Sequence, residues 1–130
     1  MEVEQRIEAS PDTVFSYLID PVKFVTWMGI GAELDPQPGG RFRIHADADN
    51  VAIGEYLVVD PPQRLVMTWG WERGTKAVPP GSTTVEITLT PDGSGTVLRL
   101  RHMGLPSGDA REHHHHGWIL YTGNLVKQFA

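Results

Sequence analysis

Cysteine is absent from this 130-residue chain. Its absence excludes disulfides, thiolate nucleophiles and sulfur-ligated metal sites, and a small domain without disulfides suits a reducing compartment. No apolar run approaches the roughly 20 residues that a membrane-spanning helix needs. The charged, alternating start at Met1–Arg6 lacks the apolar core of a secretory signal. We therefore expect a cytoplasmic protein that does not insert into a membrane.

Positive charge is also scarce. The chain has 11 lysine and arginine residues against 16 aspartate and glutamate residues, which gives a net charge of -5. Its longest basic cluster, Arg99–His102, is too short to neutralise a nucleic-acid backbone. Phosphate-binding glycine loops and a Gly-x-Ser-x-Gly nucleophile motif are missing as well. The sequence thus argues against nucleic acid as a partner, and we expect no cofactor.

The first quarter of the chain predicts one strand and two short helices. Val3–Ile7 alternates apolar with polar residues, as a strand with one wet face does. Ser10–Pro11 is a good helix start, and an apolar stripe follows until Asp20–Pro21 ends the helix. A second short helix is expected from Val22 to about Trp27.

Alternation of apolar and polar residues predicts the strands that follow, separated by turns rich in glycine and proline. After a short extended segment at 32–34, these strands cover residues 41–48, 51–60, 65–71, 85–89 and 98–102. A polar loop after Trp71 runs through Pro79–Gly81. Neighbouring strands with this pattern specify an antiparallel meander.

From about Asp109 the apolar spacing becomes helical, with Trp118, Tyr121, Leu125 and Phe129 at steps of three and four. This stripe needs an apolar partner, and only the inner face of the sheet offers one. We expect one α+β domain over residues 1–130, in which a curved antiparallel sheet wraps around a long C-terminal helix and leaves a cavity.

The order of these motifs resembles a known family. The motifs are Ile7–Phe15, the Trp27 region, Pro38–Phe42, Gly54–Leu57, Asp60–Pro62, Leu65–Trp69, Ser82–Val85 and Gly117–Trp118. In this order they resemble the bacterial proteins similar to the activator of the heat-shock-protein-ninety ATPase, within the START-like or SRPBCC superfamily. The resemblance implies a helix-grip fold of about seven strands, with two short helices between the first two strands. It also implies a pocket for an apolar ligand and no fixed catalytic residues.

The predicted pocket is lined by inward-facing side chains with few ionisable groups among them. The candidates are Trp27, Phe42, Tyr56, Met67, Trp69, Trp71, Val85, Ile87, Leu100, His102, Trp118 and Tyr121. Together they could hold a flat or fatty molecule, or they could fill the space themselves. His102 could orient a ligand, or it could be a core histidine bonded to the backbone or to Tyr121.

Four consecutive histidines, His113–His116, stand before Trp118. On a helix only His113 and His116 share a face, and two imidazoles fall short of the four ligands of a structural zinc site. We expect an exposed first helical turn and no metal site.

Three classes of function remain open. The first is non-enzymatic binding of a small hydrophobic molecule between the sheet and the C-terminal helix. The second is a cyclase- or dehydratase-type enzyme, which needs His102 and Tyr56 to converge on one cavity. The third is a chaperone-linked or stress-response interaction module, which needs a large exposed apolar patch.

The chaperone activator has an additional N-terminal domain, whereas this chain begins at the predicted strand, so chaperone binding is not carried over. An edge strand or the closing helix could form a homodimer, but nothing in the sequence predicts one.

Overall fold

One seven-stranded antiparallel sheet dominates the computed structural model, which describes residues 1–73 and 78–130. Its strands are β1 (Glu2–Ile7), β2 (Gly31–Leu34), β3 (Arg41–His45), β4 (Val51–Asp60), β5 (Arg64–Arg73), β6 (Thr83–Asp92) and β7 (Gly95–Met103). Their order across the sheet is β1-β7-β6-β5-β4-β3-β2, so only β1 leaves the meander to pair with β7. Part of the predicted polar loop, residues 74–77, lies outside the described residues. The predicted fold class is confirmed.

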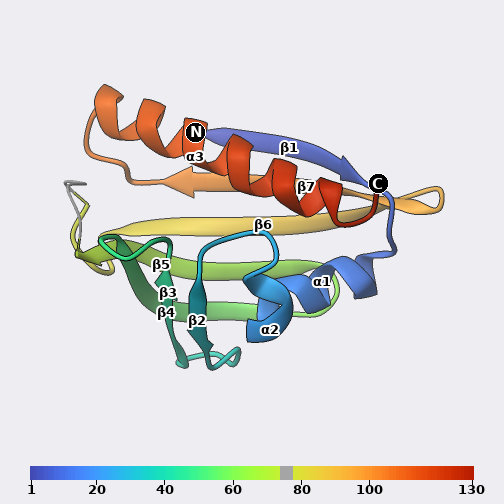
Figure 1. The fold of residues 1–130 in the computed structure, drawn as a ribbon, viewed down its shortest axis with the longest axis horizontal. Helices are drawn as coiled ribbons and strands as arrows, with labels where there is room; N and C mark the ends of the chain where they lie inside the picture. Colours follow the sequence, from blue (N-terminus) through green and yellow to red (C-terminus); the bar gives the residue numbers. More distant parts are fainter. Residues whose placement is uncertain (74–77) are drawn as a thin grey trace.

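Three helices complete the chain: α1 (Pro11–Ile19), α2 (Pro21–Phe24) and α3 (Gly108–Lys127). As expected, α1 and α2 connect β1 to β2, whereas α3 runs back along β1 and β7 (Figure 1). None of the helices in the described part of the chain is long and apolar enough to cross a membrane.

The predicted end of the second helix is wrong. α2 begins at Pro21 because the Asp20 carboxylate accepts hydrogen bonds from the backbone N–H groups of Val22 and Lys23, which caps the helix. It ends at Phe24, because the next backbone bonds are the tighter turns of a 3₁₀ type, including the one from the Trp27 N–H to the Phe24 carbonyl.

The predicted strand over 41–48 is too long at its end. β3 stops at His45, and the chain then turns around Asp47. The Asp47 carboxylate accepts hydrogen bonds from the backbone N–H groups of Asp49 and Asn50 at 2.8 Å each. An aspartate that binds its own backbone in this way favours a turn over a strand ladder.

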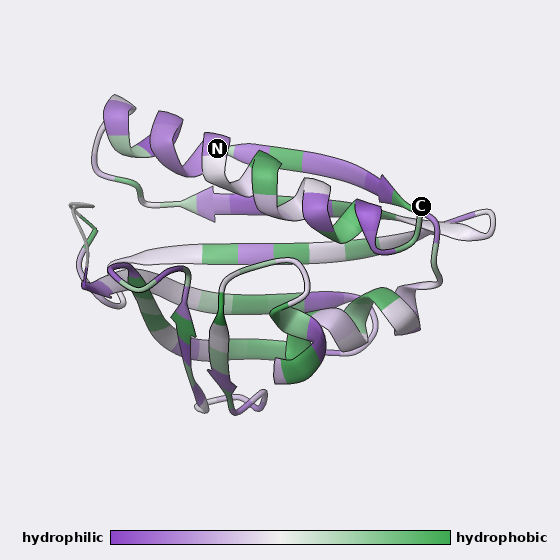
Figure 2. Ribbon diagram, viewed as in Figure 1, coloured by the Kyte–Doolittle hydropathy of each residue, from purple (hydrophilic) through white to green (hydrophobic). Residues whose placement is uncertain are grey.

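The core lies between the inner face of the sheet and the helices, with α1 and α2 contributing buried side chains as well as α3. The strands alternate hydrophobic and hydrophilic residues in bands, whereas the first half of α3 is mostly hydrophilic (Figure 2). α3 buries Trp118, Leu125, Thr122 and His114. Two of these four side chains are polar, so the helix attaches to the sheet through hydrogen bonds as well as apolar packing.

We expect Gly54→Ala to lower the free energy of unfolding by about 2 kcal/mol, the usual cost of overpacking a core. A Cβ atom on Gly54 would overlap the Thr68 carbonyl oxygen and the Phe42 ring. Urea denaturation checks this. Gly123→Ala is the control, because nothing lies within 4 Å of a Cβ there, and removing a helical glycine should raise stability by up to about 1 kcal/mol. Equal stability of wild type and Gly54→Ala would contradict the prediction.

Candidate functional site

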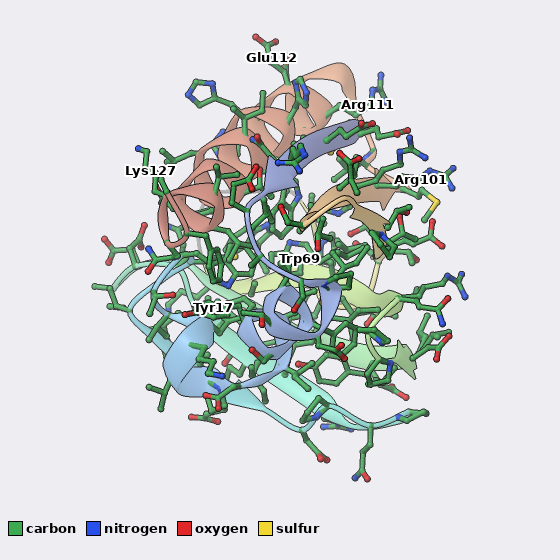
Figure 3. The ribbon with its side chains drawn as sticks, turned by 90° about the vertical axis from the view of Figure 1, so that its right-hand side faces the viewer. Tyr17, Trp69, Arg101, Arg111, Glu112 and Lys127 are labelled. Carbon is green, nitrogen blue, oxygen red and sulfur yellow. The ribbon has the colours of Figure 1, made fainter. Side chains whose placement is uncertain are left out.

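Three tryptophans form the centre of the molecule, where α3 meets the sheet. Trp69 and Trp71 come from β5 and Trp118 comes from α3. The Trp69 ring centroid lies 5.0 Å from that of Trp118 and 5.8 Å from that of Trp71, the latter pair edge to face. Trp69 lies between α3 and the sheet, whereas Arg111 and Glu112 of α3 point away from the core (Figure 3). We call these three side chains the tryptophan cluster.

His102 of β7 joins this cluster to β6 through a chain of hydrogen bonds. The Trp118 indole N–H donates to Nδ1 of His102 over 3.1 Å. The Thr83 hydroxyl donates to the Trp69 carbonyl oxygen at 2.7 Å, so the 2.8 Å contact between Thr83 and Nε2 of His102 is donated by the imidazole. Both imidazole nitrogens are therefore engaged. Burial, reinforced by the nearby His114, lowers the pKa of His102 to about 3.

His102 is thus a core histidine rather than a residue that orients a ligand. Of the two alternatives from the sequence, the second is correct, but its predicted partners are wrong. It bonds the side chains of Thr83 and Trp118 rather than the backbone or Tyr121. Sequence patterns place it facing inward but do not show which groups meet it from other elements.

The expectation of a fully exposed histidine run is also wrong. His113, His115 and His116 are exposed, but His114 is 6% exposed. Nε2 of His114 accepts a hydrogen bond from the Trp71 indole N–H at 3.0 Å, so its Nδ1, 2.7 Å from the Ala110 carbonyl oxygen, carries the proton. His114 lies four residues before Trp118, on the same helical stripe, and extending that stripe backwards would have found it.

The indole N–H of Trp69 differs from the indole N–H groups of the other three tryptophans in its hydrogen bonding. Trp71 and Trp118 donate to imidazoles, and Trp27 donates to the Tyr17 carbonyl oxygen at 2.9 Å. Trp69 is 1% exposed, and its Nε1 has no hydrogen-bond partner among the residues that the structure describes. A buried donor left unpaired costs roughly 1–3 kcal/mol of folding stability.

A cavity of about 110 Å³ lies beside the tryptophan cluster. Its lining residues are Met28, Ala46, Asp47, Asn50, Trp69, Trp71, His113, His114, Gly117, Trp118 and Tyr121. The tryptophans and Met28 are buried, whereas Asp47 and His113 are exposed. The cavity therefore has an apolar interior and a polar mouth between α3 and the turn after β3.

The structure places only some of the predicted pocket residues at the cavity and the others around a small void or in the packed core. Trp69, Trp71, Trp118 and Tyr121 line the cavity. Trp27, Met67 and Ile87, with Trp69 and Trp118, surround a narrow void of about 10 Å³, too small for more than a single water. Tyr56, Val85, Leu100 and His102 are buried, and Phe42 is packed 5.5 Å from Trp69, ring centroid to ring centroid.

Several lining residues were not expected from the sequence. Asp47 and Asn50 belong to the turn after β3, whereas the sequence predicted Asp47 within the strand over 41–48 and Asn50 between two strands. Gly117 lies four residues before Tyr121 on α3, but a glycine gives no apolar signal in a helical stripe. Burial raises the pKa of Tyr121, and so does the nearby Asp47 carboxylate.

The enzyme alternative required Tyr56 and His102 to meet at one cavity. Neither is among the described residues that line the cavity, and both nitrogens of His102 are already bonded. Burial raises the pKa of Tyr56 above its ordinary value, and the Asp35 carboxylate adds to that shift, so its phenol stays protonated. Within residues 1–73 and 78–130, no group of three or more potential metal ligands comes together.

A larger groove of about 830 Å³ lies on the outer face of β2–β5. Arg43 and Glu72, which line it, form an ion pair with a 2.8 Å contact. The groove is more open to solvent than the cavity and carries this charged pair on its wall, so we take the more enclosed cavity as the candidate site.

The comparisons with known proteins agree with this fold. The family model of the Activator of Hsp90 ATPase homolog 1-like protein matches residues 8–130. An AHSA1-like protein from Rhizobium etli is 41% identical, with a TM-score of 0.74 over 97% of this chain and 79% of its own. A protein from Mesorhizobium loti is 29% identical, with a TM-score of 0.83 over 98% and 93%. CalU16 from Micromonospora echinospora is 28% identical, with a TM-score of 0.80 over 98% and 64%. The comparison with curated proteins gives no match.

Proposed function

This chain belongs to the Activator of Hsp90 ATPase homolog 1-like family, and from that premise we propose that it binds a small hydrophobic molecule in the cavity beside the tryptophan cluster. The observation that carries the proposal is the cavity itself, because it has an apolar, aromatic interior and opens at a polar mouth. Ligand sites in proteins commonly combine an apolar lining with a few polar groups that orient the ligand.

The size of the cavity limits the ligand. At about 110 Å³ it is smaller than the roughly 300–1,000 Å³ typical of drug-sized ligands. The tryptophan cluster occupies much of the space between α3 and the sheet. This favours a compact molecule over a long fatty chain.

Binding without catalysis is the simpler interpretation of the side chains around the cavity. The hydrogen bonds of His102 and His114 make both imidazoles part of the attachment between α3 and the sheet. A general base needs a free nitrogen within reach of the substrate, and His102 offers none.

Native mass spectrometry of the purified protein, compared with denatured spectra, tests the proposal. We expect a reproducible added mass that denaturation removes and that Trp69→Ala abolishes. Trp27→Ala is the control, because Trp27 lies outside the cavity lining. If only the unliganded mass appears, and no compact hydrophobic compound in a screened panel binds, the proposal fails and a protein-interaction role becomes the better candidate.

A further inference from the structure

Trp69 lies between two apolar spaces in the core, the cavity of about 110 Å³ and the void of about 10 Å³, and it lines both. We infer that Trp69 determines how long a ligand the cavity accepts, because its indole closes the cavity at the inner end. This inference rests on the proposed function, since it concerns the ligand of the same cavity. It goes further by assigning one side chain the role of selecting a single-ring molecule over the same ring with a longer chain.

The inward-facing residues of β5 follow one another from the cavity to the void. Trp71 lines the cavity, Trp69 lines both spaces, and Met67 lines the void. Neighbouring residues on one face of a strand are roughly 7 Å apart, so the void begins one side chain beyond the cavity. Trp118 of α3 also lines both spaces, and its ring centroid lies 5.0 Å from that of Trp69. These two indoles therefore form the partition between the cavity and the void.

Of the two indoles in the partition, Trp69 is the one held by packing rather than by a hydrogen bond. Trp118 donates its N–H to His102 and thereby attaches α3 to the sheet. The Trp69 N–H has no partner among the described residues, and its ring is packed against those of Phe42, Trp71 and Trp118 at centroid separations from 5.0 to 5.8 Å. A smaller apolar residue at position 69 would therefore open the partition without breaking a side-chain hydrogen bond.

The partition limits the length of the ligand because the space in front of it is short. A cavity of roughly 150 Å³ in an apolar protein core holds benzene, and the cavity here is somewhat smaller but opens at a mouth. A single ring fills this space, so a longer alkyl chain has to leave through the mouth into water. Each methylene group that stays in water forgoes the roughly fourfold gain in affinity that its burial would give. Trp69 thus removes the advantage that a longer chain would otherwise have.

The test compares acetophenone with valerophenone, which carries the same ring and ketone on a longer alkyl chain. NMR titration of the full chain gives both affinities for wild type and for Trp69→Leu. The ratio of the valerophenone affinity to the acetophenone affinity is then compared between the two proteins, which cancels the different hydration of the probes. We expect this ratio to be about tenfold higher in Trp69→Leu, as burial of about two more methylene groups should give.

Met67→Ala is the matched control for this variant. Met67 lies on the same face of β5 and lines the void but is not among the residues that line the cavity, so its replacement enlarges the void and leaves the partition in place. The affinity ratio should therefore stay at its wild-type value. A ratio raised as much in Met67→Ala as in Trp69→Leu would overturn the inference, because the chain would then reach the void past Trp69.

A second measurement uses wild type alone and does not depend on the folding of a variant. Nuclear Overhauser contacts from the terminal methyl group of bound valerophenone should not reach Met67 or Ile87, which line the void beyond Trp69. Contacts with these residues in wild type, or an unchanged affinity ratio in folded Trp69→Leu, overturn the inference while the proposed function stands. If neither ketone binds wild type or Trp69→Leu at millimolar concentration, the cavity takes no single-ring molecule, and both the inference and the proposed function fail.

Discussion

Replacing Gly117 with leucine is expected to weaken the binding of small single-ring probes such as acetophenone to the cavity by about 100-fold, while the protein stays folded. Gly117 lies on α3 and lines the cavity, and the nearest atom to a Cβ placed there is Cε2 of Tyr121 at 3.9 Å. The backbone thus accepts a side chain at this position, and a leucine side chain would occupy space that the ligand needs. Burial of one apolar ring contributes about 1.5–3 kcal/mol, which sets the scale of the loss.

Gly123→Leu is the matched control for this variant. Gly123 lies on the same helix, nothing is within 4 Å of a Cβ there, and it is not among the residues that line the cavity. Both substitutions replace a helical glycine, so each should raise stability by up to about 1 kcal/mol, which thermal unfolding checks. Only Gly117→Leu should lose the probes. Wild-type affinity in that variant would show that the probes bind elsewhere.

The comparison of Gly117 with His114 shows what a sequence can and cannot reveal about this site. Apolar periodicity predicted the sheet, α1 and α3, because each needs one buried face and the residue spacing follows that face. The same periodicity marks Trp118 and Leu125. It does not mark Gly117, which has no side chain, and it marks His114 only if a histidine is allowed to be a core residue.

The hydrogen-bond pairing of the tryptophans could not have been predicted in the same way. Trp69, Trp71 and Trp118 look alike in the sequence, as large apolar residues on inward faces. Which indole N–H finds a partner depends on side chains brought in from β7 and α3, namely His102 and His114. The cavity volume has the same origin, because it is the space left after these large side chains have packed.

Acidification from pH 7 to pH 5 is expected to lower the free energy of unfolding by about 2 kcal/mol through His102 alone. Burial, reinforced by nearby His114, lowers the pKa of His102 from 6.5 to about 3 in the folded protein. At pH 5 the folded imidazole is therefore still neutral, whereas the unfolded one has bound a proton. The stabilisation is complete above pH 6.5 and is lost as the pH falls from there towards 3, at about 1.4 kcal/mol for each pH unit.

The hydrogen bonds of His102 explain why the folded protein resists this proton. Protonation would place an N–H on Nδ1, where the Trp118 indole already donates. Urea unfolding of wild type and of His102→Gln between pH 5 and pH 7 checks the prediction, because glutamine does not titrate and the other acid-sensitive groups are shared. The gap in unfolding free energy between the two proteins should change by about 2 kcal/mol over this range. His116→Gln, which alters an exposed histidine of the same helix, should follow wild type. Parallel curves for wild type and His102→Gln would mean that His102 is not the group whose protonation opposes folding.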